Sequence, residues 1–296
     1  MPELPEVETI KRSLQKAIVG KKIVDIEVRK AKIFQGDTKE VIGKTIEKVE
    51  RRGKILIIQL SGGKNLLVHF KLTGQMVWAP REGESVAVGH PIPFAGTKLP
   101  AKTTHVIFEI DDPPSHKASA RQSGKLFYND LRQFGWIKVV ESSKLKVQSE
   151  VAKLGVEPFD KEFTVDYLTQ VFSKTSRPIK LILMDQEKIA GVGNIYANDA
   201  LFEAGILPAK PAKKLNNLEI EKLRKAVIKV LEDGLKFGGS SAADEAYIKP
   251  SGEKGEYQEH FRVYQRDGEK CRKCDGVIRR INLGGRGTFW CPKCQR

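Results

Sequence analysis

The chain has 296 residues, which predicts about two domains on the usual range of roughly 100–200 residues per domain. It carries 52 Lys and Arg against 37 Asp and Glu, and this net charge of +15 favours a polyanionic partner, with nucleic acid ahead of an anionic membrane surface. The longest uninterrupted aliphatic run is residues 55–58, which excludes a transmembrane helix. The N-terminus is acidic and lacks an apolar segment, so no signal peptide is expected. Four cysteines are too few for a disulfide scaffold.

The first half of the chain predicts one helix followed by a β domain. Residues 5–18 have the spacing of a helix, because Val7, Ile10 and Leu14 recur at three- and four-residue steps before Gly20. Short apolar runs separated by turn clusters follow, a pattern typical of a β-sandwich or barrel. The predicted strands are residues 23–28, 45–49, 55–60, 66–70, 106–110, 126–129 and 137–140. Residues 79–102 hold four prolines, and we expect a long loop there.

After residue 140 the spacing of apolar residues becomes helical. The apolar stripe of the longest predicted helix is typical of a packed core. Residues 238–255 are rich in Gly, Ser and Ala and predict a mobile loop. The predicted helices are residues 166–172, 179–185, 194–204 and 218–237.

The four cysteines form two close pairs near the end of the chain. Cys271, Cys274, Cys291 and Cys294 have the spacing C-x2-C-x16-C-x2-C, which lies in the range of zinc ribbons. Two redox-active pairs, or free buried thiols, are the alternatives. We predict one structural Zn²⁺, because both pairs are intact and four protein thiolates leave no coordination position open for catalysis.

A hairpin is predicted between the two cysteine pairs. Residues 277–281 and 288–290 have strand character on either side of Gly284-Gly285, a turn signal that places Arg286 at or beside the tip. The last 35 residues hold ten Lys and Arg against three acidic residues. Arg286 is therefore predicted to contact phosphate, and a solvated arginine is the alternative.

The N-terminus carries a second chemical signal. Removal of Met1 would expose Pro2 as a secondary amine, which can attack an aldehyde-like carbon and form an iminium. Glu3 and Glu6 place two carboxylates close to this amine and near a helix N-terminus. In the alternative interpretation Pro2 only protects the chain from degradation and the glutamates only favour the first helical turn. The motif by itself does not decide between them.

Taken together, three separated motifs resemble bacterial formamidopyrimidine-DNA glycosylase. They are PELPEVET at residues 2–9, GVGNIYA at residues 191–197 and the four-cysteine finger, and the resemblance extends over residues 2–293. It implies an α+β multidomain chain. The expected parts are an N-terminal β-sandwich with a leading helix (1–143), a helical helix-two-turns-helix domain with a lesion loop (144–260) and a zinc finger (261–296).

This resemblance implies a bifunctional DNA glycosylase and AP lyase of base excision repair. Such an enzyme excises 8-oxoguanine and formamidopyrimidines from duplex DNA through a Schiff base at Pro2, and then cleaves the strand by β,δ-elimination. It implies a monomer acting on damaged double-stranded DNA in the bacterial cytoplasm, at the nucleoid. The related endonuclease VIII prefers oxidised pyrimidines and typically has Gly where this chain has Leu4. A non-enzymatic zinc-ribbon binder of DNA or RNA would explain the charge and the cysteines, but not Pro2-Glu3.

By resemblance, the catalytic residues are Pro2, Glu3, Lys54 and Arg286. Pro2 is the expected nucleophile on C1′, and Glu3 the acid and base that assists opening of the sugar ring. Glu6 is the expected supporting carboxylate. Lys54 is expected beside the lesion phosphate, where its charge would also disfavour protonation of the Pro2 amine. A solvated charge is the alternative for Lys54.

The resemblance also assigns contacts with the DNA backbone. Asn194, which opens a predicted helix, and Arg286 are expected to hold the phosphates that flank the lesion. His69 and Tyr264 match further backbone-contact positions, although each has the alternative of an ordinary core or sheet residue. Residues 238–255 match the loop that recognises the lesion.

Three further residues match the side chains that fill the gap left by an everted base. These are Leu72 as an apolar wedge, Arg132 facing the opposite base and Phe134 wedging the opposite strand. The wedge is usually methionine in this family, so Leu72 is a departure. Arg132 would favour cytosine through its acceptors. The alternative places Leu72 and Phe134 in the core of the β domain.

Overall fold

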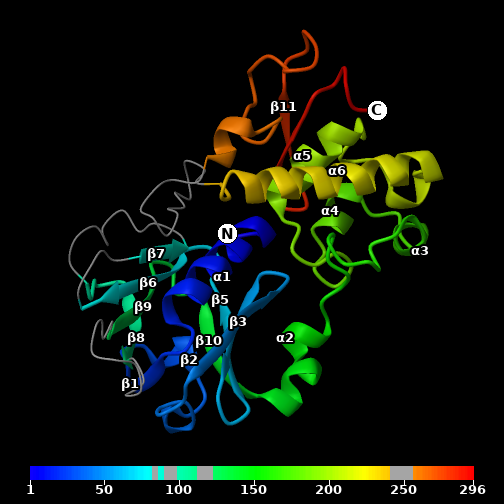
Figure 1. The fold of residues 1–296 in the computed structure, drawn as a ribbon. Helices are drawn as coiled ribbons and strands as arrows, with labels where there is room; N and C mark the ends of the chain where they lie inside the picture. Colours follow the sequence, from blue (N-terminus) through cyan, green and yellow to red (C-terminus); the bar gives the residue numbers. More distant parts are fainter. Residues whose placement is uncertain (82–85, 90–98, 112–122, 241–255) are drawn as a thin grey trace. The chain divides into compact units, whose positions relative to one another are not determined.

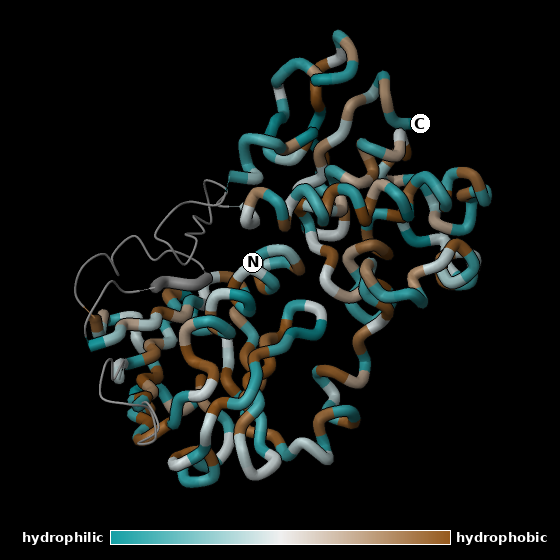
Figure 2. Tube along the Cα trace, in the orientation of Figure 1, coloured by the Kyte–Doolittle hydropathy of each residue, from teal (hydrophilic) through white to brown (hydrophobic). Residues whose placement is uncertain are grey.

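The computed structural model describes residues 1–81, 86–89, 99–111, 123–240 and 256–296. The chain divides into two compact units (Figure 1). The first comprises Met1–Ala152 and Phe237–Glu256, and the second Lys153–Lys236 and Tyr257–Arg296. Figure 2 shows apolar segments inside both units, as expected where each unit has a core of its own.

Two five-stranded sheets and one helix, α1 (Leu4–Ile18), build the first unit. One sheet has the order β1-β8-β9-β6-β7 and the other β2-β10-β5-β4-β3, and all neighbours are antiparallel except β2 and β10. The strands are β1 (Lys22–Val28), β2 (Phe34–Gln35), β3 (Ile46–Arg52), β4 (Ile55–Leu60), β5 (Lys64–His69), β6 (Gly74–Pro80), β7 (Val86–Gly89), β8 (Thr104–Asp111), β9 (Gly124–Asp130) and β10 (Trp136–Glu141). Short helical segments are η1 (Ala31–Ile33), η2 (Thr38–Glu40), η3 (Ser142–Val147) and α2 (Ser149–Ala152).

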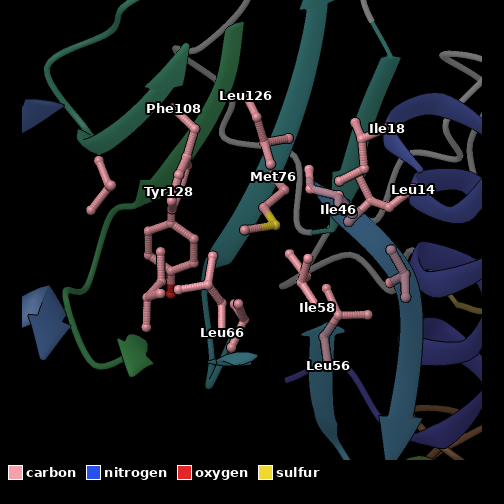
Figure 3. Packing of buried hydrophobic residues seen from close by; sticks show 14 of the residues in the cluster. Leu14, Ile18, Ile46, Leu56, Ile58, Leu66, Met76, Phe108, Leu126 and Tyr128 are labelled. Carbon is pink, nitrogen blue, oxygen red and sulfur yellow. The ribbon is translucent and has the colours of Figure 1, made fainter. Parts of the chain in front are cut away.

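Side chains from both sheets and from α1 share one hydrophobic core (Figure 3). The face of α1 that carries Val7, Ile10, Leu14 and Ile18 is buried, which is the stripe that its sequence spacing predicts. Each apolar side chain removed from water here contributes roughly 1.5–3 kcal/mol. The helix that begins at the N-terminus is therefore anchored to the sandwich along its length.

Two connections cross from one sheet to the other at the same end of the sandwich. Residues 70–73 join β5 to β6, and residues 131–135 join β9 to β10. Strand β5 pairs with β10, with His69 opposite Trp136, while β6 pairs with β9, with Gly74 opposite Asp130. The two connections therefore run side by side in opposite directions.

The second unit is helical and ends in a two-stranded hairpin. The helix α6 buries Leu223, Val227, Val230 and Leu231, which confirms that its apolar stripe is core. Gly234 of α6 lies so close to α5 that an added Cβ would sit 2.5 Å from the Tyr196 hydroxyl. The elements are α3 (Val165–Ser173), α4 (Ile179–Leu183), α5 (Asn194–Ala204), η4 (Ala212–Lys214), α6 (Asn217–Lys236), η5 (Tyr257–His260), β11 (Arg279–Leu283) and β12 (Arg286–Trp290).

The α+β fold class is confirmed, with corrections to single elements. The loop expected over residues 79–102 is wrong at residues 79–80 and 86–89, because β6 continues to Pro80 and pairs with β7. Residues 82–85 and 90–98 of that expected loop lie outside the described residues. Strand β6 was not predicted, because it contains Gly and Pro and is buried on both faces, so polar and apolar residues do not alternate along it. The two-residue strand β2 is too short to show any period. Within the described ranges, no helix combines the length and apolar character needed to cross a bilayer.

Replacing Leu14 by Ala should destabilise the first unit by about 2–5 kcal/mol, the usual range for truncating a buried leucine. Leu14 has no exposed surface, so the truncation leaves a cavity between α1 and the sandwich. Urea unfolding followed by circular dichroism measures the loss. Lys16→Ala, on the exposed face of the same helix, is the matched control and should shift stability by no more than about 0.5 kcal/mol. Equal effects of the two substitutions would contradict this account of the core.

Candidate functional site

The N-terminal residues are held by a capping box at the start of α1. Glu3 is the N-cap, and its N–H donates to Glu6 Oε2 at 2.8 Å while its carboxylate accepts from the N–H of Glu6. Both glutamates are only 3% exposed, and Pro2 is buried as well. Reciprocal capping satisfies donors that a helix start otherwise leaves open. Pro2, Glu3 and Glu6 are therefore brought together in one rigid turn.

Glu6 also contacts a segment far along the chain. Its Oε1 accepts from the N–H of Ser240 at 2.9 Å, in a buried position. Gly239 has φ +84°, and a Cβ there would lie 3.0 Å from the Glu6 side chain, so the close approach requires glycine. One carboxylate thus fixes both the N-terminal turn and the start of the predicted lesion loop. The rest of that loop, residues 241–255, lies outside the described residues.

Lys54 occupies the turn between β3 and β4, where Gly53 adopts φ +56°. The Lys54 side chain is 5% exposed, so the alternative of a solvated charge is wrong. Lysine is seldom buried this deeply, because its ammonium loses hydration. Register pairing of Ile55 with His69 places this turn beside the end of β5. Lys54 and His69 therefore belong to one part of the site.

His69 is a neutral hydrogen-bond donor. Burial, together with the positive charges of Lys71 and Lys54, lowers the pKa of His69 from 6.5 to about 3. Its Nδ1 accepts from the N–H of Lys71 at 3.0 Å, which assigns the ring proton to Nε2. The ring lies 5.7 Å from that of Trp136. A neutral imidazole that carries its proton on Nε2 can donate a hydrogen bond to an anion without adding positive charge.

The three predicted gap-filling residues lie on the two connections that cross between the sheets. Leu72 is half-buried, whereas Arg132 and Phe134 are exposed. Phe134 is 55% exposed, so the alternative that it belongs to the core is wrong. The Arg132 guanidinium lies 5.4 Å from the centroid of the Phe134 ring. Leu131, on the same connection, is 53% exposed as well. Exposed apolar side chains that gather in one place favour a binding surface.

In the second unit, the side-chain amide of Gln186 makes hydrogen bonds that hold the two turns between α4 and α5. Gln186 Nε2 donates to the carbonyls of Met184 and Val192 at 2.8 and 2.7 Å, and its Oε1 accepts from the N–H of Gly191 at 3.0 Å. Gly191 has φ +92°, which favours glycine. Helix α5 begins at Asn194, as predicted. Its N-cap is Gly193, which has no side chain and makes no side-chain cap.

The four cysteine sulfurs form one cluster. They lie within 4.8 Å of one another, and the closest pairs are 3.4 to 3.8 Å apart. Tetrahedral zinc with Zn–S bonds of about 2.3 Å requires sulfurs about 3.8 Å apart, so the donor set fits Zn²⁺. The N–H groups of Lys273 and Gly276 donate to the sulfurs of Cys271 and Cys274 at 3.3 and 3.4 Å. These donors would stabilise thiolates toward the metal.

The hairpin that carries Arg286 is fixed to the helices. Arg286 opens β12, directly after the Gly284-Gly285 turn that was predicted. The adjacent carbonyl, of Gly287, accepts from Asn194 Nδ2 at 3.2 Å and from the buried ammonium of Lys180 at 2.8 Å. The structure therefore brings Asn194 and Arg286 together.

Three residues that position the finger were not predicted from the sequence. Lys180 lies in an otherwise apolar helix, and its ammonium also donates to Thr288 Oγ1 at 2.7 Å. Asn198 Oδ1 accepts from the N–H of Phe289 at 2.8 Å. Asp199 is fully buried. Each of the three is a polar residue at a position where the helical spacing favours an apolar one, and this is the signal by which the sequence could have indicated them.

Asp199 organises the segment that leads into the finger. It accepts from the N–H groups of Arg262, Val263 and Tyr264 at 3.0 to 3.2 Å. Burial raises the pKa of Asp199, and these donors oppose that shift. The Tyr264 ring packs at 5.2 Å against Phe289 and is half-buried. Tyr264 is therefore part of the packing at the base of the finger.

Comparison with known proteins agrees with this geometry over the whole chain. Residues 1–137 match the formamidopyrimidine-DNA glycosylase N-terminal domain, residues 154–246 its H2TH domain, and residues 268–296 the zinc finger found in FPG and IleRS. The chain is 37% identical to formamidopyrimidine-DNA glycosylase of Desulfitobacterium hafniense over 300 residues, covering 100% of both, and 38% identical to that of Pelotomaculum thermopropionicum, covering 100% and 99%. The chain belongs to the formamidopyrimidine-DNA glycosylase family.

Solved structures of this family agree with the fold. A complex between the Lactococcus lactis Fpg and DNA containing an abasic site matches with a TM-score of 0.84 and 32% identity over 99% of each chain. Another, of the same protein with Fapy-dG-containing DNA, matches with a TM-score of 0.83 and 32% identity over 99% and 100%. The predicted resemblance is thus confirmed. Family membership supports a glycosylase rather than the non-enzymatic zinc-ribbon binder.

The finger holds one structural Zn²⁺, as predicted. The finger match and the clustered sulfurs agree, so the alternative of two redox-active cysteine pairs is wrong. The metal supplies folding free energy to a small segment whose core is otherwise limited to a few residues. That core contains Phe202, Val263, Cys271, Ile278, Phe289 and Cys291.

Replacing Cys291 by Ser should abolish zinc binding and weaken binding to damaged duplex DNA, because the hairpin that carries Arg286 loses its metal. The measurements are zinc content by atomic absorption and DNA affinity by fluorescence anisotropy. Circular dichroism should show that the β-sandwich stays folded. Lys293→Ala, an exposed change inside the same cysteine pair, is the matched control and should keep its zinc. Unchanged DNA affinity in a zinc-free variant would contradict the prediction.

The low pKa of His69 has a consequence for acid stability. The unfolded chain takes up a proton at His69 near pH 6.5, whereas the folded chain does so only near pH 3, so folding should weaken as the pH falls from 6.5 toward 3. His69→Gln should remove this contribution and flatten the decline. Urea unfolding at a series of pH values checks it, with the exposed His260→Gln as control. A variant with the same pH slope as the wild type would show that His69 does not titrate this way.

Proposed function

We propose that this chain is a bifunctional DNA glycosylase and AP lyase that excises oxidised purines, 8-oxoguanine and formamidopyrimidines, from duplex DNA in base excision repair. The observation that carries the proposal is the buried capping box of Glu3 and Glu6, which fixes the residue that becomes the N-terminus, Pro2, at the start of α1. A purely structural cap does not require a proline amine next to it.

The proposed chemistry begins with attack of the neutral Pro2 amine on C1′, which breaks the N-glycosidic bond. The base leaves with the bonding electron pair and takes up a proton, and the Pro2 nitrogen loses its own N–H proton. The C1′–O4′ bond then opens, the sugar oxygen takes a proton from Glu3, and C1′ and the Pro2 nitrogen form an iminium. Loss of the 2′ proton expels the 3′ phosphate, and loss of the 4′ proton expels the 5′ phosphate. Hydrolysis of the iminium would regenerate the amine.

The proposed roles of Lys54 and His69 follow from their burial and charge. Lys54 would place a cation beside the lesion phosphate, inside a site where water screens little. It would also disfavour protonation of the Pro2 amine. His69 would donate its Nε2 proton to a phosphate as a neutral group. Glu6 would act through position, because its two oxygens are committed to backbone N–H groups.

Contacts with the rest of the duplex are proposed for both units. Asn194 and Arg286 would hold phosphates flanking the lesion, with Tyr264 as a further backbone contact and Arg286 assisting catalysis through that grip. Leu72, Arg132 and Phe134 would fill the gap left by the everted nucleotide.

The wider proposals come from the family. The Lactococcus lactis relatives are bound to DNA that contains an abasic site or Fapy-dG, which supports damaged duplex DNA and an oxidised purine rather than an oxidised pyrimidine. We also propose a monomer acting at the bacterial nucleoid in the cytoplasm. The proposed domain limits stay at residues 1–143, 144–260 and 261–296, and residues 238–255 are proposed to recognise the lesion base.

Trapping with borohydride tests the lyase directly. Hydride reduces an iminium to a stable amine, so the chain with Met1 removed should become covalently linked to duplex DNA containing 8-oxoguanine opposite cytosine. The same chain with an uncleaved N-terminal extension should bind that duplex yet neither excise nor trap, because its Pro2 nitrogen is then an amide. Mass spectrometry defines each N-terminus. Full trapping by the extended chain would refute Pro2 as the nucleophile.

Substrate class is tested separately. Excision of 8-oxoguanine and of an oxidised pyrimidine, each in the same duplex sequence, should favour the purine. A preference for the pyrimidine would indicate the specificity of endonuclease VIII instead. Both assays use initial rates with enzyme in excess, so that product release does not mask the preference.

A further inference from the structure

One buried carboxylate connects the two crossing connections of the sandwich. Asp130 ends β9 and is 1% exposed. Its Oδ2 accepts from the N–H of Gly135 at 2.7 Å, on its own connection. Its Oδ1 accepts from the N–H of Arg132 at 3.2 Å and from the hydroxyl of Thr73, which lies on the other connection.

Thr73 closes this network. Its hydroxyl oxygen accepts from the N–H of Arg132 at 2.9 Å while donating its proton to Asp130. One hydroxyl therefore contacts both the backbone and the carboxylate of the neighbouring connection. Thr73 directly follows Leu72, and Arg132 lies two residues before Phe134. The three gap-filling residues are thus joined through backbone positions at or next to them.

Asp130 is itself held from a third strand. Its N–H donates to the carbonyl of Thr103 at 2.9 Å, and its carbonyl lies 2.8 Å from His105 Nε2. His105 is buried within β8. The carboxylate is therefore attached to the sandwich rather than to a free loop, and the two connections are fixed relative to the sheets.

The backbone of each connection adopts a strained conformation that the surrounding structure maintains. Lys71 has φ +50° and Gln133 has φ +55°, and these residues immediately precede Leu72 and Phe134. Side-chain-bearing residues seldom adopt this conformation, and they keep it only where the surroundings require it. Gly135 cannot be replaced by a residue with a side chain, because a Cβ there would lie 1.9 Å from the Tyr128 hydroxyl.

We propose that Asp130 and Thr73 are positioning residues that hold the two connections as one body, so that Leu72, Arg132 and Phe134 meet the duplex in a fixed arrangement. This inference rests on the proposed function. Filling a gap of one nucleotide requires several side chains at once, and each independent motion lost on binding lowers affinity. A clamp that removes the relative motion beforehand favours insertion and keeps Arg132 aimed at the opposite base.

Hydrogen exchange tests the clamp without using activity. Thr73→Val removes the hydroxyl at nearly constant volume and should speed amide exchange at Arg132 by about two- to tenfold, the effect of losing one intramolecular hydrogen bond. Asp130→Asn should speed exchange at Arg132, at Gly135 or at both, because an amide offers only one acceptor oxygen. Thr73→Ser keeps the hydroxyl and should match the wild type. Exchange that is unchanged in both Thr73→Val and Asp130→Asn would overturn the clamp.

Opposite-base preference tests what the clamp does. The rate of 8-oxoguanine excision opposite cytosine, divided by the rate opposite adenine, should fall about three- to tenfold in Thr73→Val and recover in Thr73→Ser. In an Arg132→Ala background, Thr73→Val should change that ratio no further, because it acts through Arg132. A purely structural role would lower both rates equally and leave the ratio unchanged, which would overturn the positioning role.

The two levels of failure are distinguishable. A wild-type chain that neither excises nor traps overturns the proposed function, whatever the exchange data give. A wild-type chain that is active, combined with exchange that is faster in Thr73→Val and a base ratio that stays constant, overturns only the positioning role. Faster exchange together with a reduced ratio and rescue by serine supports the inference.

Discussion

Buried carboxylates that accept backbone N–H groups hold the functional parts of this molecule in place. Glu6, Asp130 and Asp199 are each almost fully buried, and each accepts from segments that lie far apart in the sequence or that leave a strand or helix. Removing a carboxylate from water is costly, and donors must face it from all sides to offset that cost. The surrounding backbone therefore has little freedom. The start of α1, the crossing connections and the base of the finger depend on these three groups.

In the second unit, a buried lysine holds a backbone carbonyl group in the way that the buried carboxylates hold N–H groups. Lys180 is fully buried and donates to the carbonyl of Gly287, whereas acids elsewhere accept from N–H groups. The excess of basic residues over the whole chain, which gives the net charge of +15, favours an anionic partner.

Sequence patterns predicted the parts whose determinants are local. The placement of Glu3 and Glu6 at a helix start involves four residues, the Gly284-Gly285 turn two, and each cysteine pair four, so their geometry follows from short-range chemistry. The spacing of apolar residues likewise predicted the helices α1 and α6.

Other features depend on which strands become neighbours, and no local pattern carries that information. Asp130 and Thr73 are 57 residues apart and meet only because β6 pairs with β9 while β5 pairs with β10. Strand β6 is buried on both faces and lacks the alternation that reveals a half-exposed strand. Lys180 and Asn198 were missed for a related reason, since their partners lie on β12, about 90 or more residues further along the chain.

The left-handed backbone at Lys71 and Gln133 lowers the conformational entropy of the two connections in the unbound molecule. Glycine would fit this conformation with less strain, yet it would also open many other conformations to the connection. A residue with a Cβ has only a small allowed region there, so the backbone before Leu72 and Phe134 fluctuates within narrow limits. The local strain therefore narrows the ensemble in the unbound molecule. The strain costs a small amount of enthalpy in the folded state. Because the backbone is already restricted, less conformational entropy is lost when these side chains contact a partner.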